Sequence, residues 1–262
     1  NITMISVERD TTFLRDKMAS VTCQEDKFFM IEGLPRSGTT ILTNIFNSLG
    51  NGFCFSEPLW QLMQDPYGLK LGKLSGFFVP SVDPRYMIPN LRAVLHGRDF
   101  KLGGLKETYR DWQTQCVDIV DDSYLDFRIF ILREPAYNFS GWKKTPFGAE
   151  YYDVDIFLRN YKSFIERIKR KSSKVPTYVV KYENLCAADD PISYLGNLLS
   201  DELGLAGDLL LENTGYSYGD AKGNSSKTIS AARTDQHNLS VHEANVCFGI
   251  ADLYSAISEG RQ

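Results

Sequence analysis

The sequence predicts an α/β fold, a three-layer sandwich in which helices cover both faces of a central, mainly parallel sheet. Two observations support this prediction. Strand-like apolar runs alternate along the chain with helix-like amphipathic stretches, which is the order that builds parallel sheets. A glycine-containing loop also joins the first strand-like run to a helix-like stretch. The chain of 262 residues is long enough for one such domain, and we expect residues 1–262 to form a single domain.

Five apolar runs have the length of strands. The predicted strands are Phe28–Glu32, Phe53–Ser56, Leu102–Leu105, Arg128–Leu132 and Thr177–Lys181. Apolar residues recur every three or four positions from Val154 to Lys171, which is the spacing of one helix face. A second helix is predicted from Ile192 to Leu203, just before a glycine.

Two segments lack this periodicity. The segment at about residues 60–100 contains Pro80, Pro84 and Pro89 and predicts an irregular cap over a pocket. The segment at about residues 215–230 is rich in glycine, serine and lysine and predicts a long loop. Loops of that length in compact domains are often functional or disordered.

Composition restricts the partners and the location. The formal net charge of −4 provides no positive field for nucleic acid or an anionic membrane, so neither is expected as a partner. No apolar run approaches the roughly 20 residues of a membrane span. The five cysteines are scattered without a metal-binding spacing, so we expect no metal and a reducing, cytoplasmic location. The oligomeric state cannot be derived from the sequence.

The strongest motif is FFMIEGLPRSGTTILTNIF, in which a strand, a glycine-containing loop and a helix follow one another. Gly33 and Gly38 permit unusual backbone angles. The loop N–H groups and the N-terminus of the helix then point at a bound anion. The motif therefore predicts a P-loop-like phosphate site.

A departure from the common motif indicates which anion binds. In the nucleotide-hydrolysing P-loop G-x-x-x-x-G-K-[ST], a lysine reaches the β- and γ-phosphates beside Mg²⁺. Here that position is Thr39, and the cation is Arg36, inside the loop. An arginine within the turn is suited to a phosphate lying in the loop itself. A single 5′-phosphate that carries a transferable group fits this arrangement.

The run PRSGTT after a strand resembles the 5′-phosphosulfate loop of sulfotransferases that use 3′-phosphoadenosine 5′-phosphosulfate (PAPS), especially the branch with tyrosylprotein and many bacterial enzymes. The resemblance implies transfer of a sulfuryl group from PAPS to a hydroxyl or amine, with adenosine 3′,5′-bisphosphate (PAP) as product. It also implies that Arg36 stabilises the leaving phosphate. The residues implied to bind the 5′-phosphosulfate are Arg36, Ser37, Gly38, Thr39 and Thr40.

A second motif supports the first. The predicted strand FRIFIL ends at Arg133, which is followed by Glu134-Pro135 and a helix-like stretch. Ligands of open α/β sheets collect at such strand ends. In sulfotransferases a strand ending in Arg-x-Pro and a serine in the next helix form the 3′-phosphate site, so the resemblance implies this role for Arg133 and Ser140. The usual serine position lies one residue farther along, at Gly141.

The transfer requires a base for the acceptor's proton and a cation for developing charge. Phenol and steroid sulfotransferases have a K-x-H segment at a strand end, which resembles Lys106 with Thr108 in place of the histidine. The base role then passes to a carboxylate. Glu57 lies where tyrosylprotein-type enzymes have their glutamate, and Glu107 is the reserve candidate. Lys106 is expected to stabilise charge on the sulfuryl or bridging oxygen.

The resemblance also places Lys222, Ser226 and Lys227 in a loop over the 3′-phosphate and adenine. The acceptor, a small molecule or a peptide, is not identified by the sequence. Two alternatives remain open. One is a P-loop kinase or NTPase that uses ATP and Mg²⁺, and the other is a non-catalytic nucleotide-binding module. The joint presence of Arg36, Glu57 and Lys106 argues against the second.

Overall fold

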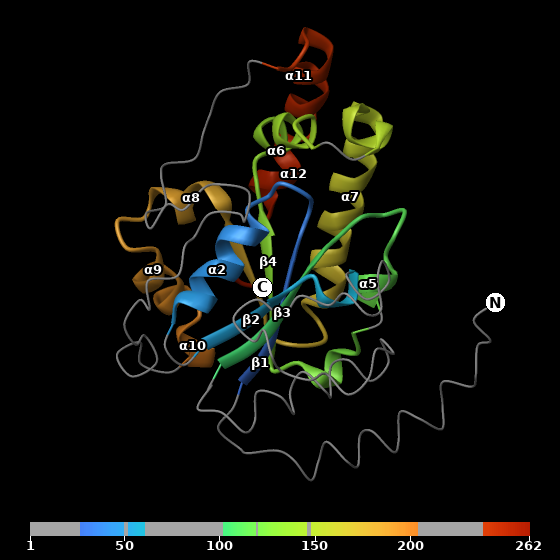
Figure 1. Ribbon diagram of the computed structural model, residues 1–262. Coiled ribbons are helices and arrows are strands. Elements are labelled where there is room, and N and C mark those ends of the chain that lie inside the picture. The colour runs from blue at the N-terminus through green and yellow to red at the C-terminus, as the bar shows by residue number, and fades with distance from the viewer. Residues whose placement is uncertain (1–26, 50–51, 61–101, 119, 146–147, 204–237) are drawn as a thin grey trace, which may run out of the picture.

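The computed structural model describes residues 27–49, 52–60, 102–118, 120–145, 148–203 and 238–262 (Figure 1). The predicted loop at about 215–230, with Lys222, Ser226 and Lys227, lies outside these residues. Almost all of the predicted cap at about 60–100 does so as well. In the part of the chain that is described, no helix is both long and apolar enough to cross a membrane.

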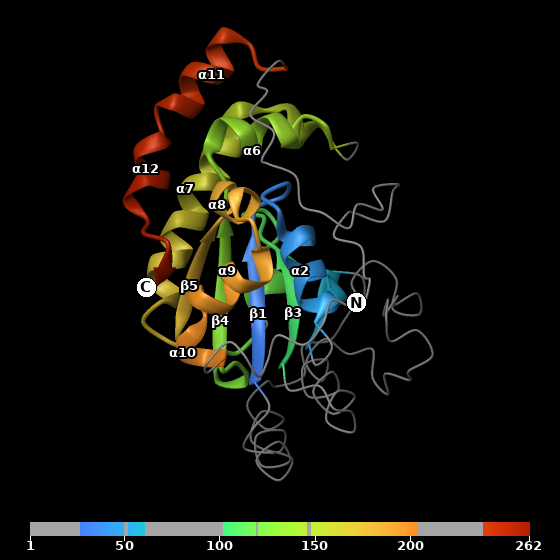
Figure 2. The same ribbon diagram turned by 90° about the vertical axis from the view of Figure 1, so that its left-hand side faces the viewer.

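Six described strands form one sheet in the order β2-β3-β1-β4-β5-β6. Their bounds are β1 Lys27–Gly33, β2 Gly52–Ser56, β3 Leu102–Thr108, β4 Phe127–Leu132, β5 Thr177–Lys181 and β6 Gly260–Arg261. The first five are parallel to their neighbours, and β6 pairs antiparallel with β5. Figure 2 shows β5, β4, β1 and β3 side by side. The five predicted strands are confirmed, and β6 was not predicted because two residues give no periodic signal.

Helices lie on both faces of the sheet, so the predicted three-layer α/β fold is confirmed (Figure 1). The first group comprises α2 Thr39–Ser48, α8 Tyr182–Ala187, α9 Pro191–Leu198 and α10 Ser200–Leu203. The second comprises α5 Gln115–Asp118, α6 Pro135–Trp142, α7 Val154–Lys171, α11 Val241–Phe248 and α12 Ala251–Ala256. Two short 3₁₀ helices are η2 Asp122–Tyr124 and η3 Ala149–Tyr152. The two groups pack against two separate apolar cores, one on each face.

The helix predicted over Val154–Lys171 has those bounds. Asp153 caps it by accepting hydrogen bonds from the N–H groups of Asp155 and Ile156. Its apolar stripe is buried, and the basic residues of its last turn complement the helix dipole. The helix predicted over residues 192–203 is instead two helices, α9 and α10. The chain leaves the helical conformation at Leu199, with φ −101° and ψ 16°, and the Leu199 side chain is buried in the core.

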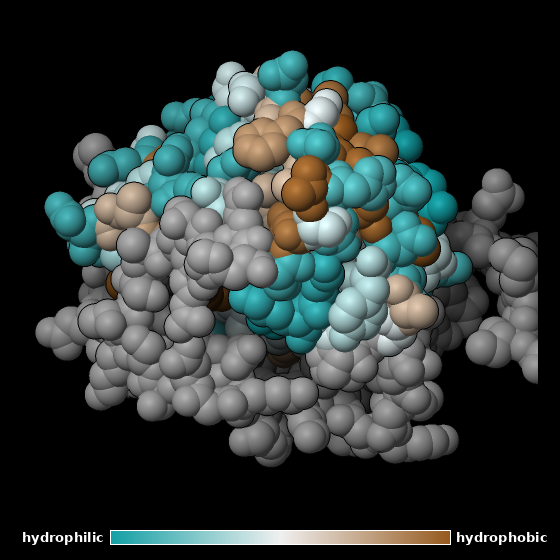
Figure 3. Space-filling view, turned by 90° about the horizontal axis from the view of Figure 1, so that it is seen from above, coloured by the Kyte–Doolittle hydropathy of each residue, from teal (hydrophilic) through white to brown (hydrophobic). Residues whose placement is uncertain are grey.

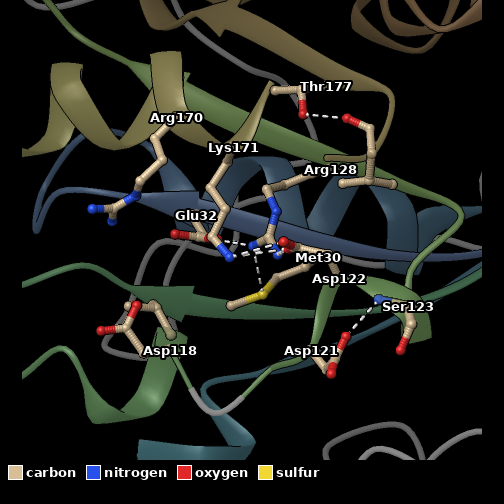
Figure 4. Close-up of polar contacts among 12 residues, drawn as sticks. Met30, Glu32, Asp118, Asp121, Asp122, Ser123, Arg128, Arg170, Lys171 and Thr177 are labelled. Atoms are coloured by element: carbon tan, nitrogen blue, oxygen red, sulfur yellow. Dashed lines mark hydrogen bonds and ion pairs between the residues drawn. The ribbon is translucent and has the colours of Figure 1, made fainter. Parts of the chain in front are cut away.

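A buried ion-pair network lies where β1 meets its loop (Figure 4). The Glu32 side chain is 0% exposed, and its carboxylate accepts hydrogen bonds from Arg128 of β4 and Arg167 of α7. Arg128 Nη2 also lies 2.6 Å from Asp122 Oδ1, and Arg167 Nη1 lies 2.6 Å from Asp118 Oδ1. Because Glu32 directly precedes the glycine loop, these contacts fix the end of β1 against β4 and α7.

We expect Glu32→Gln to destabilise the fold strongly, because an amide leaves two buried guanidinium groups without their shared anion. Removing one partner of a buried ion pair typically costs about 3–5 kcal/mol in the free energy of unfolding. Urea unfolding of the wild type and the variant measures the change. The matched control is Glu166→Gln, since Glu166 forms an exposed pair with Lys169 and exposed pairs contribute little. Equal stability of the two variants would contradict this account of the network.

Candidate active site

The loop between β1 and α2 leads into an uncapped helix N-terminus. Gly38 is the N-cap of α2 with φ 99° and ψ 12°, and no side chain caps the helix. The first turn of α2 contains no acidic residue. The N–H groups of residues 38–41 therefore have no acceptor within the helix, and the positive end of the helix dipole is not neutralised locally. This is the arrangement that binds a phosphate group.

The backbone conformation and close packing of the loop require glycine at two positions. Gly38 has a positive φ, and a Cβ at this position would lie 2.2 Å from the Tyr182 ring. A Cβ at Gly33 would lie 2.5 Å from Ser37 Oγ. Arg36 itself has a φ of 63°, which is uncommon for a residue other than glycine. Such strain is kept where the surrounding structure holds it, often at functional sites.

Side chains from α6 hold the loop in place. The carbonyl oxygen of Pro35 accepts hydrogen bonds from Asn138 Nδ2 at 2.8 Å and Trp142 Nε1 at 2.7 Å. The carbonyl oxygen of Arg36 accepts one from Arg133 Nη1 at 3.0 Å. Inside the loop, Ser37 Oγ donates to the carbonyl oxygen of Leu34 at 2.7 Å. The loop carbonyls are thus engaged by the protein, which leaves the N–H groups at the start of α2 to face a ligand.

Two arginines, Arg36 and Arg133, lie at this loop. Arg36 is exposed, and its backbone contacts Arg133. The guanidinium carbon of Arg133 lies 4.4 Å from the centre of the Tyr182 ring, a cation–π contact that orients it. Arg133 Nε is buried and has no hydrogen-bond partner among the described residues. No described carboxylate lies within ion-pair distance of either arginine, so both suit an anionic ligand.

A carboxylate and an ammonium meet at the ends of β2 and β3. Glu57 Oε2 lies 3.4 Å from Lys106 Nζ, and the Thr108 hydroxyl donates to Glu57 Oε1. Lys106 and Thr108 share one face of β3 because side chains alternate along a strand. The Glu57 N–H donates to the Lys106 carbonyl oxygen at 2.7 Å, and Glu57 has a φ of 49°. The strained turn thus directs the Glu57 carboxylate at these two side chains.

These contacts keep Glu57 ionised. Burial alone raises the pKa of Glu57, but the Lys106 ammonium, the Thr108 hydroxyl and the Arg110 guanidinium more than offset this and hold the pKa below its ordinary value. Glu57 is therefore a carboxylate at neutral pH, the form that accepts a proton.

Glu107 is in a different environment. It lies on the opposite face of β3 from Lys106, is 0% exposed, and accepts a hydrogen bond from the Leu59 N–H at 2.6 Å. Its Oε2 atom has no partner among the described residues. Burial, and then the nearby Glu57 carboxylate, raise the pKa of Glu107 well above its ordinary value. The pKa values of the two carboxylates are therefore shifted in opposite directions, and the roles of Glu57 as base and of Glu107 as reserve stay predictions.

Comparisons with known proteins place this geometry in a known fold. No family model matches the sequence, and no curated protein does so either. The sulfotransferase domain of the Synechococcus PCC 7002 olefin synthase has a similar structure, with a TM-score of 0.56 and 15% sequence identity over 89% of this chain and 97% of that domain. The chain has the sulfotransferase fold. Mouse sulfotransferase SULT7A1 complexed with PAP matches with a TM-score of 0.42 and 14% identity over 97% of this chain and 91% of the mouse chain.

Ser140 and Gly141, in the helix that follows Arg133, have different environments. Gly141, not Ser140, faces the loop: a Cβ at Gly141 would lie 2.9 Å from Arg36 Cβ and 3.6 Å from Arg133 Nη1. Ser140 is one helical step away, and its buried hydroxyl donates to Asn238 Oδ1 at 2.5 Å. The absence of a side chain at position 141 gives α6 its close approach to Arg36. A phosphate contact from Ser140 stays a prediction and requires the bond to Asn238 to be exchanged.

Sequence reasoning missed several residues of the site. Thr108 was noted only as the replacement of a histidine, although its spacing of two residues from Lys106 in a strand places both on one face. Asn138 and Trp142, which hold the Pro35 carbonyl, carry no sequence signal for that contact because it joins segments about 100 residues apart. The same holds for Tyr182, which contacts both Gly38 and Arg133.

We expect Lys106→Met to raise the pKa of Glu57, because burial then acts with less opposition. In the wild type, the depressed pKa of Glu57 stabilises the fold at pH values above the pKa that Glu57 has in the unfolded chain. This contribution is lost as the pH falls through the pKa of Glu57 in the folded protein. In the variant this contribution becomes smaller, because fewer contacts compensate for the burial of the carboxylate.

Carbon-13 NMR titration of labelled glutamate side chains, with the Glu57 signal assigned from Glu57→Gln, measures this change. Thr108→Val should shift the pKa in the same direction by less, because the lysine is the larger of the two stabilising influences. An unchanged or lower Glu57 pKa in Lys106→Met would show that the ammonium does not control this carboxylate.

Proposed function

We propose that the protein is a sulfotransferase that transfers a sulfuryl group from PAPS to a hydroxyl or amine acceptor. One observation carries the proposal: the glycine loop, with two arginines that have no carboxylate partner among the described residues, lies at the same, carboxyl, end of the parallel strands as the Glu57–Lys106 pair. Ligands of open α/β sheets bind at that end. A phosphate site and an acid–base pair at one edge suit group transfer from a phosphorylated donor.

The residues present fit the donor. The uncapped N-terminus of α2 and Arg36 suit the 5′-phosphosulfate, together with the backbone of Ser37, Gly38, Thr39 and Thr40. Arg133, whose buried Nε atom has no described partner, suits the 3′-phosphate. PAPS supplies the sulfuryl group and a phosphate leaving group. The position of the P-loop lysine is Thr39, which is buried in the first turn of α2 and offers no cation to a γ-phosphate.

The chain's own residues manage the proton and the charge. Glu57, ionised by its neighbours, accepts the proton of the acceptor hydroxyl as the acceptor oxygen forms its bond to sulfur. Lys106 Nζ lies 3.4 Å from that carboxylate and stabilises negative charge on the sulfuryl or bridging oxygen. Arg36 stabilises the charge left on the phosphate when the sulfur–oxygen bond breaks. Cytoplasmic location and a small-molecule or peptide acceptor stay predictions from the sequence.

We expect PAP to raise the melting temperature of the protein without any metal ion, because arginines and backbone N–H groups supply the phosphate contacts. At a concentration one hundred times Kd the gain is about 2.7 kcal/mol. Arg133→Ala should lose most of the shift, whereas Arg170→Ala, which removes an exposed arginine in the last turn of α7, should keep it. Thermal-shift measurements with PAP and with ATP and Mg²⁺ decide the donor. Stabilisation by ATP that depends on Mg²⁺, with none by PAP, would support a kinase or NTPase instead.

We expect Glu57→Gln to fold and bind PAP but to lose about 10²–10⁴-fold in transfer rate, because an amide does not accept a proton at neutral pH. Release of PAP in the presence of PAPS and an acceptor measures the rate, and circular dichroism checks folding. Glu107→Gln is the comparison. If Glu107→Gln is inactive while Glu57→Gln turns over normally, Glu107 is the base. If both variants stay active, neither carboxylate is.

A further inference from the structure

Arg110 lies two residues beyond the end of β3, at the same end of the sheet as Glu57 and the phosphate loop. Two contacts fix its guanidinium group. Its Nε atom donates to the Tyr151 hydroxyl at 2.8 Å, and its guanidinium carbon lies 4.8 Å from the centre of the Trp60 ring. Neither contact uses the two terminal nitrogens, and these have no hydrogen-bond partner among the described residues. The group is held in place with its two terminal donors still available.

Two carboxylates near Arg110 have other partners. Asp111, the next residue, pairs with Arg159, with Arg159 Nε 2.5 Å from Asp111 Oδ2. Glu57 is bound by Lys106 and Thr108. No described carboxylate lies within ion-pair distance of Arg110. A half-buried arginine that is oriented and has no anionic partner in the described part of the chain is suited to a ligand that brings one, and its fork geometry matches a carboxylate.

An aromatic cluster connects Arg110 to the phosphate loop. Tyr151 lies 5.9 Å from Trp112 and 5.3 Å from Trp142, measured between ring centres. Trp142 donates to the Pro35 carbonyl oxygen of the loop. Trp112 is 38% exposed although it is a large apolar residue. Seen from above, the described surface at this end of the molecule carries apolar residues among polar ones (Figure 3).

We propose that Arg110 binds a carboxylate on the acceptor, and that the apolar part of the same acceptor contacts Trp112. The inference rests on the proposed function, since it concerns the molecule that receives the sulfuryl group. The acceptor is then an anionic molecule with a planar or apolar part between its carboxylate and its hydroxyl. Arg110 secures the carboxylate while the hydroxyl reaches Glu57.

The test uses two probes that share the same hydroxyphenyl group and differ at the carboxyl group: 3-(4-hydroxyphenyl)propanoate, which is charged, and its methyl ester, which is neutral. Calorimetric titration of PAP-saturated protein measures the affinity for each. The wild type should bind the carboxylate about 10- to 100-fold more tightly than the ester, the range expected for hydrogen bonds to a charged group. In Arg110→Gln this ratio should fall to near one.

Two further variants keep the test informative if Arg110→Gln folds poorly. Tyr151→Phe retains the ring contacts but removes the acceptor of the Arg110 Nε hydrogen bond, so the ratio should fall part of the way. Arg261→Gln removes an arginine that pairs with Asp201 at the far edge of the sheet, and the ratio should not change. Rates of sulfuryl transfer to the two probes distinguish carboxylate binding from an effect of Arg110 on Glu57. If Arg110 acted only on Glu57, its replacement would slow transfer to both probes by the same factor.

Equal affinity of the wild type for the two probes, or no binding of the carboxylate, overturns the inference while PAP binding leaves the proposed function intact. An unchanged ratio in Arg110→Gln overturns it as well. If the protein does not bind PAP, the proposed function is contradicted, and the inference about the acceptor is contradicted with it.

Discussion

The buried carboxylate of Glu32 is the constraint on which the site depends. A charge removed from water is tolerated only if its partners are well placed, and Glu32 finds them on β4 and α7, in Arg128 and Arg167. The residue after Glu32 begins the phosphate loop. These ion pairs therefore join β1, β4 and α7 where the loop begins, and they hold the first residue of the loop in place.

The far side of the loop is fixed by a second set of contacts. Asn138 and Trp142 of α6 bind the Pro35 carbonyl oxygen, and Arg133 binds that of Arg36. With these carbonyls engaged, the N–H groups at the start of α2 and the exposed Arg36 side chain are left to face a ligand. The strained backbone of Arg36 is tolerable because both flanks are held. The anion site therefore depends on hydrogen bonds that engage the loop carbonyls as well as on the glycines of the loop.

Structural features that depend on neighbouring residues in the chain could be predicted from the sequence. The five parallel strands, the helix over Val154–Lys171 and the glycine loop follow from periodicity and spacing within about 20 residues. Contacts between distant segments could not be predicted. The chain leaves the helical conformation at Leu199, whose side chain is buried in the core, and Ser140 bonds to Asn238, 98 residues away. The family pattern suggested a serine near Arg133, but the structure has Gly141 facing Arg36, where a side chain would not fit.

A crystal structure of the protein with PAP, grown without divalent metal, tests the central claim most directly. The account predicts the 5′-phosphate at the N-terminus of α2, with its oxygens within hydrogen-bond distance of the N–H groups of Gly38, Thr39 and Thr40 and of the Arg36 side chain. It predicts the 3′-phosphate at Arg133. A 5′-phosphate bound away from this loop, or a site filled only by a nucleoside triphosphate with Mg²⁺, would contradict it.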